Sequence, residues 1–274
     1  MTDPLAVGQA PSGGPMAGSP VPERLPLRGS LTFPRDRYFA LQAAGEALFG
    51  RADLPLPEKV LALHQMVSRE SRGESLPGAE EAVAAARAAG PGHDDTKARL
   101  ILGVFLNSLL QTDGQAPVRG GVGLMVSLLF GLAKQVGGFG SLRIPRWEVT
   151  VGVNAVQAVP MREIQAEADR AWEALLRQQL ANGWLVRYGS VFLGASLLLM
   201  EVGLLQWFTR ASAVAAGRSA PTGEDVDRAL DLVRAELVEA GPGFRLALEG
   251  AFSVFYDALL DRPAVAASLA CTGR

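Results

Sequence analysis

Glu201 is the residue of this sequence most suited to chemistry, because it is a carboxylate inside the apolar run of residues 188–208 (YGSVFLGASLLLMEVGLLQWF). At helical spacing Ser190, Gly194, Leu197 and Glu201 share one face, so the carboxylate could look into a groove opened by the glycine. Burial raises the pKa of a carboxyl group, which can then orient a substrate amine or act as a general base. The structural alternative, an ion pair with an arginine or a position near the surface, is favoured. Glu201 is kept as the candidate catalytic residue.

The two histidines give weaker signals. His64 lies at the edge of an apolar helical face, which is typical of a hydrogen-bonded core histidine. His93 is followed by Asp94 and Asp95, a combination that also occurs in metal sites. This position begins a predicted helix, however, where aspartates cap free backbone N–H groups. The sequence therefore predicts no metal site, and it contains no nucleophile elbow, Walker loop, zincin helix or kinase signature.

Residues 188–208 are long enough to span a membrane. Three features favour the core of a helical domain instead. Glu201 would lie in hydrocarbon at a cost of several kcal/mol unless it is paired. Glycines at positions 189, 194 and 203 weaken the helix. The neighbouring predicted helices are amphipathic, with charged outer faces that require water. We therefore expect a core helix and no membrane span.

Apolar residues at helical spacing dominate the chain beyond residue 34. Helices are predicted within residues 34–50, 57–73, 77–92, 93–114, 120–140, 160–184, 188–208, 221–243 and 243–263. In residues 143–157 (RIPRWEVTVGVNAVQ) valines alternate with other residues, which predicts a short strand or extended segment. The fold class is therefore all-α, a single domain of about eight helices around the apolar helix.

Composition sets the domain boundary and excludes several classes of site. Residues 1–34 are rich in proline, glycine and serine, which predicts a flexible arm before a helical domain of residues 35–274. The net charge of -2 argues against a nucleic-acid partner. A single cysteine, Cys271, excludes an internal disulfide framework, a multi-cysteine zinc site and a cysteine-held iron–sulfur cluster within one chain. No secretory signal is visible, so cytoplasmic localisation is expected.

The second half of the chain resembles a known family in the order of its elements. The stretches EADRAWEALLRQQLANGWLVRYG, SVFLGASLLLMEVGLLQWF and PTGEDVDRALDLVRAEL follow one another, and RDRYFALQAAGEALFGRADLPLPEKVLALHQMV lies upstream. This order is similar to the helical C-terminal region of the flagellin lysine-N-methylase family, over most of residues 35–260. The family's cysteine-rich N-terminal region, thought to hold an iron–sulfur cluster, is replaced here by the arm, so no such cluster is expected. The matched positions are structural, and no catalytic residue is carried over.

Two functional hypotheses follow, and whether the chain is an enzyme stays open between them. The resemblance implies a diverged protein-lysine methyltransferase that uses S-adenosylmethionine and acts on a surface protein such as flagellin. The alternative is a non-catalytic scaffold that binds a protein through its alanine-rich amphipathic helices. Both hypotheses predict a protein partner, and neither fixes the identity of that partner or the oligomeric state.

Overall fold

The computed structural model describes residues 22–89, 95–110, 134, 136–239 and 259–271, which are mostly helical. The strands form two antiparallel hairpins, β1 (Arg24–Arg28) with β2 (Leu31–Pro34) and β3 (Ser141–Ile144) with β4 (Val149–Gly152). The α-helices are α1 (Arg35–Gly50), α2 (Leu56–Ser71), α3 (Ala79–Ala89), α4 (Asp95–Leu110), α6 (Val153–Ala158), α7 (Gln165–Ala181), α8 (Trp184–Arg187), α9 (Val191–Ala215), α10 (Gly223–Val233) and α13 (Pro263–Ala270). A 3₁₀ turn, η1 (Pro145–Trp147), and a π-helix, η2 (Arg234–Val238), complete the described elements. The expected helical fold class is confirmed.

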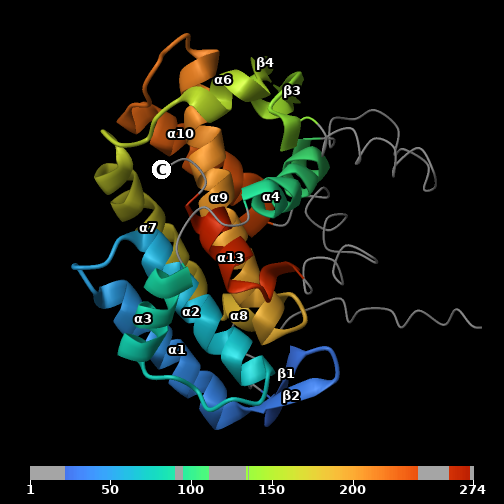
Figure 1. The fold of residues 1–274 in the computed structure, drawn as a ribbon, viewed down its shortest axis with the longest axis vertical. Helices are drawn as coiled ribbons and strands as arrows, with labels where there is room; N and C mark the ends of the chain where they lie inside the picture. The colour runs from blue at the N-terminus through green and yellow to red at the C-terminus, as the bar shows by residue number, and fades with distance from the viewer. Residues whose placement is uncertain (1–21, 90–94, 111–133, 135, 240–258, 272–274) are drawn as a thin grey trace, which may run out of the picture.

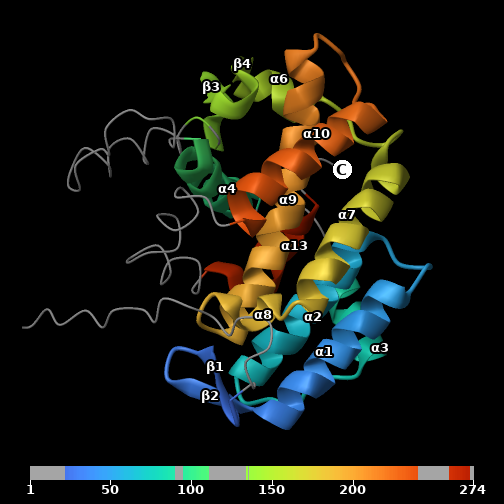
Figure 2. The same ribbon diagram turned by 180° about the vertical axis from the view of Figure 1, so that it is seen from behind.

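Helix α9 runs through the middle of the molecule, with α1, α3 and the β1–β2 hairpin toward one end and β3, β4 and α6 toward the other (Figure 1, Figure 2). It packs against α2, α8, α10 and α13. Ser190 caps its first turn, because its side-chain oxygen accepts a hydrogen bond from the backbone N–H of Leu193 at 3.2 Å. The most apolar 18-residue window of α9 is 94% buried inside the protein. This burial is that of a core helix rather than of a membrane span.

The N-terminal hairpin corrects the predicted boundary of the arm. Residues 24–34 were expected to be flexible, yet β1 and β2 pair, and Leu25, Leu27 and Phe33 are buried in the core. Two leucines at a spacing of two place both side chains on one face of β1, which is sufficient to bury the hairpin despite its prolines. The prediction is therefore wrong for residues 24–34. Residues 1–21 lie outside the described part of the chain.

The segment predicted to be extended forms a hairpin and then a helix. Strands β3 and β4 lie on either side of η1, and Glu148 closes the turn with a left-handed φ of 55°. From Val153 onward the chain is helical, because α6 begins directly after β4. Helix α13 was not predicted. The predicted helices within 120–140 and 243–263 fall mainly on residues outside the described ranges.

Candidate functional site

Glu201 lies at the centre of α9 and is completely buried, with 0% of its surface exposed. Its Oε1 accepts a hydrogen bond from Nε2 of Gln179, on α7, at 2.9 Å. Its Oε2 has no hydrogen-bond partner among the described residues. Burial raises the pKa of Glu201 to about 8, and the Gln179 hydrogen bond opposes this shift to a smaller extent. Neither structural alternative holds in the described part of the chain, because Glu201 is not at the surface and its partner is an amide instead of an arginine.

The groove expected beside Glu201 does not exist at Gly194. A Cβ atom added to this glycine would lie 2.3 Å from the carbonyl oxygen of Leu185 and 2.5 Å from its Cα. The backbone of α8 therefore occupies the space that the missing side chain leaves open. Gly194 serves close packing between α8 and α9, and the prediction of a groove is wrong.

His64 is a core histidine, as expected. It is 1% exposed, and its Nε2 lies 3.2 Å from the hydroxyl oxygen of Ser196 on α9. Burial lowers the pKa of His64 to about 4, so the ring is neutral near pH 7. His93 and Asp94 lie outside the described residues, and α4 begins at Asp95. Within the described ranges, no group of three His, Cys, Asp or Glu side chains is placed to hold a metal ion.

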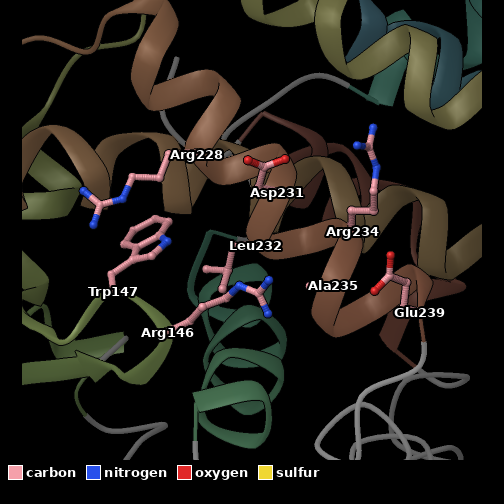
Figure 3. A pocket seen from close by; sticks show the side chains of 8 residues that line it. All are labelled: Arg146, Trp147, Arg228, Asp231, Leu232, Arg234, Ala235 and Glu239. Atoms are coloured by element: carbon pink, nitrogen blue, oxygen red, sulfur yellow. The ribbon is translucent and has the colours of Figure 1, made fainter.

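A cavity of about 450 Å³ lies between the β3–β4 hairpin and the α10–η2 segment (Figure 3). It is called the arginine cavity here, and its lining residues are Arg146, Trp147, Arg228, Asp231, Leu232, Arg234, Ala235 and Glu239. Trp147 and Arg228 lie at one end in Figure 3, and Arg234 and Glu239 lie at the other. One α-helix, the 3₁₀ turn of a hairpin and a π-helix therefore meet at one polar surface.

Local structure explains how Trp147 is held in this cavity. Pro145 occupies the first turn of η1, and the left-handed residue Glu148 ends that turn directly after the tryptophan. The Trp147 ring packs edge-on against Phe208 of α9, with ring centroids 5.9 Å apart. The guanidinium of Arg228 lies 4.6 Å from the centroid of the indole. The indole is thus fixed on one side by the core and covered by a cation, which is a favourable cation–π arrangement.

Arginines outnumber carboxylates among the residues that line the arginine cavity. Three arginines line it against two carboxylates, Asp231 and Glu239. Arg146 lies 3.8 Å from Glu236. Arg228 and Arg234, in contrast, have no carboxylate partner in the described part of the chain. Guanidinium groups without such partners are available to bind a carboxylate or another anion.

A second, smaller cavity of about 240 Å³ lies beside α7, α8 and η2. Its lining residues are Leu175, Gln178, Gln179, Asn182, Trp184, Arg187, Arg234, Val238 and Glu239. The two cavities share Arg234 and Glu239, so both border the π-helix. A π-helix inserts an extra residue into a turn and is frequent at functional sites.

Sequence reasoning did not single out the arginine cavity. Arg146 and Trp147 are adjacent in the sequence, but Arg228 and Arg234 follow about eighty positions later. A tryptophan flanked by charged residues at the turn of a predicted extended segment was the available signal. Comparisons with protein-family models, with curated proteins and with solved structures found no match to this chain.

Proposed function

We propose that this protein is a non-catalytic binding domain whose arginine cavity takes an acidic segment of a partner protein. The observation that carries the proposal is the pair Arg228 and Arg234, two guanidiniums at one cavity without carboxylate partners among the described residues. Arginine presents a planar fork that matches a carboxylate in two parallel hydrogen bonds. Trp147, half-buried beneath Arg228, holds that guanidinium at the cavity through the cation–π contact.

The exposure of the residues that line the cavity determines how fast a partner binds and how strongly salt weakens the binding. Arg146 and Arg234 are exposed, whereas Arg228 and Trp147 are half-buried. Exposed charge pairs contribute little individually and are screened by salt, so the interaction is expected to be fast and to weaken with ionic strength. Such a surface fits a binding domain, because guanidiniums open to water can be reached by the acidic side chains of a partner.

Binding at the arginine cavity can be measured through the fluorescence of Trp147. The chain has four tryptophans, and Trp172, Trp184 and Trp207 are fully buried. Quenching of tryptophan fluorescence by iodide therefore reports mainly on Trp147. Binding of a poly-glutamate peptide is expected to protect this indole and to change its emission. Poly-lysine should have no such effect.

Replacing both Arg228 and Arg234 with glutamine is expected to weaken poly-glutamate binding about tenfold, since each exposed charge pair contributes roughly 0.2–1 kcal/mol. The matched control is Arg162→Gln/Arg170→Gln, which removes two positive charges from exposed positions outside the cavity. Equal affinity of the double variant and the control would contradict the proposal. Protection of Trp147 by poly-lysine as strong as by poly-glutamate would contradict it too.

Protein-lysine methylation stays a prediction that rests on the sequence resemblance. If the chain binds S-adenosylmethionine in its folded state only, saturating ligand must stabilise the folded state and raise the melting temperature. The free energy of unfolding increases by about 2.7 kcal/mol when the ligand concentration is one hundred times the dissociation constant. Thermal melts with and without this ligand, together with a methyl-transfer assay on flagellin, measure it. If the ligand does not shift the melting temperature and no methyl group is transferred, the binding domain remains the sole hypothesis of the two.

A further inference from the structure

The contact between Glu201 and Gln179 leaves two acceptor atoms unsatisfied. Gln179 is 4% exposed and Glu201 is 0% exposed. The Gln179 Nε2 donates to Glu201 Oε1, but Gln179 Oε1 and Glu201 Oε2 have no hydrogen-bond partner among the described residues. A buried polar atom without a partner costs free energy, and a buried charge without a counter-ion costs much more.

One proton on Glu201 removes this cost at both atoms. An ionised carboxylate only accepts hydrogen bonds, whereas a carboxylic acid has one O–H donor. A carboxylic acid and a primary amide are complementary, because each presents one donor and one acceptor on the same edge. We propose that Glu201 holds a proton in the folded protein and donates it to Gln179 Oε1, so that a reciprocal acid–amide pair locks α7 to α9 until alkaline pH removes the proton.

The charged groups on the elements packed against α9 have contacts elsewhere. Glu173 and Arg177 of α7 pair with each other, and Glu173 also binds Lys59 of α2. Other groups on these elements also have partners: Glu58, Arg69 and Glu70 of α2 with Arg87, Glu74 and Arg37, His64 with Ser196, Asp225 of α10 with Arg218, Arg187 of α8 with Trp184, Arg24 of β1 with Thr32, Arg28 of β1 with Asp261, and Arg210 of α9 with the Gln206 carbonyl. Five further groups are exposed to solvent: Glu167 and Arg170 of α7, and Glu224, Asp227 and Asp231 of α10. Lys97 and Arg99 are the cations of α4, and α6, β4 and α13 carry no charged residue. No charged group in the described part of the chain contributes to the pKa of Glu201, which burial alone raises.

The sign of the pH dependence follows from the two states of Glu201. In the unfolded chain the carboxyl titrates near its ordinary pKa of 4.5, and in the folded chain its pKa is about 8. The folded state therefore holds more protons between these values. The stability that the proton contributes is complete below pH 4.5 and is lost as the pH rises toward 8.

The test is a carbon-13 NMR titration of the full chain labelled at the side-chain carboxyl of glutamate. One glutamate resonance is expected to keep the shift of a protonated acid at neutral pH and to titrate with a midpoint near 8. The side-chain amide protons of Gln179 should shift with the same midpoint. A wild-type spectrum in which every glutamate is ionised at neutral pH overturns the proposal, and that outcome requires no variant to fold.

Glu201→Gln supplies the assignment and a second readout. The new amide can donate to Gln179 Oε1 without a proton that titrates, so the upshifted resonance is expected to disappear and the fold to persist. The melting temperature of the variant should rise relative to wild type as the pH increases from 5 to 9. Glu46→Gln, at an exposed position of α1, is the matched control and should leave this pH dependence unchanged. A Glu201→Gln variant with the same pH dependence as wild type contradicts the proposal.

Discussion

Replacing Gly194 with alanine is expected to lower the stability of this protein by about 3 kcal/mol or more, because the new Cβ has no space. It would lie 2.3 Å from the Leu185 carbonyl oxygen, 2.5 Å from its Cα and 2.6 Å from its carbonyl carbon. These atoms belong to the backbone of α8, which cannot rotate away as a side chain can. The substitution gains roughly 1 kcal/mol of helix propensity, and the overpacking exceeds that gain.

Thermal unfolding measures this effect. For a domain of this size each kcal/mol corresponds to about 2–4 °C, so a fall of roughly 6 °C or more is expected. Gly50→Ala is the control, because Gly50 ends α1 and its added Cβ would only reach ordinary contact with Arg177, at 3.9 Å. That variant should be neutral or slightly stabilised. A Gly194→Ala protein that melts with wild type would show that α8 does not lie against α9 at this residue.

Gly194 also shows where sequence reasoning stops. Its place on the same helical face as Ser190 and Glu201 follows from the helical repeat, and α9 has the predicted central position. The repeat does not say what covers that face. A glycine in an apolar helix predicts an open groove and close backbone packing equally well, and only the tertiary structure, in which α8 folds back on α9, separates them.

Local signals predicted the ends of several helices. Gly50 ends α1 as expected, and Thr222 caps α10 with Asp225 in a capping box. These signals act within one turn of helix, so they can be read from a single segment. The β1–β2 hairpin was missed for the opposite reason. Its proline- and glycine-rich composition indicates flexibility, whereas its order comes from burying Leu25 and Phe33 against distant helices.

The candidate sites depend on contacts that cross the chain. The burial of Glu201 was foreseeable from its apolar neighbours. Its hydrogen-bond partner, Gln179, was not, because the helix that carries Gln179 was predicted from its apolar residues and its polar residues were not assigned contacts. In the arginine cavity the guanidinium of Arg228 lies over the ring of Trp147. The two residues are too far apart in the sequence for any local pattern to predict this contact. Pairing of this kind is set by the packing of α10 beside the β3–β4 hairpin.

Removing the carboxylate of Glu173 is expected to destabilise the protein by about 3–5 kcal/mol, since it leaves a buried charge without its counter-ion. Lys59 is 3% exposed, and its ammonium donates to Glu173 Oε2 at 2.7 Å and to the Phe49 carbonyl oxygen at 3.1 Å. In Glu173→Ala the carbonyl is the one acceptor left among the described residues. A single neutral acceptor does not compensate a desolvated ammonium.

Removing Lys59 instead is expected to lower the free energy of unfolding far less, by about 1 kcal/mol. The difference between the two single variants is therefore a stricter test than either loss alone. In Lys59→Met the thioether chain keeps most of the buried volume. Glu173 is partly exposed, at 20%, and keeps an ion pair with Arg177 at 3.0 Å. The carboxylate therefore remains both paired and hydrated.

The double variant Lys59→Met/Glu173→Ala completes the argument, because it removes the unpaired ammonium that makes Glu173→Ala costly. It is expected to be more stable than Glu173→Ala alone by about 2 kcal/mol or more, since adjacent charged partners are strongly non-additive. Urea unfolding of the wild type and the three variants gives the coupling energy, with unchanged denaturant slopes as the check that the unfolded states are comparable. If the two single losses simply add in the double variant, Lys59 and Glu173 are not energetically coupled, and the buried cation owes its place to the Phe49 carbonyl and to packing alone.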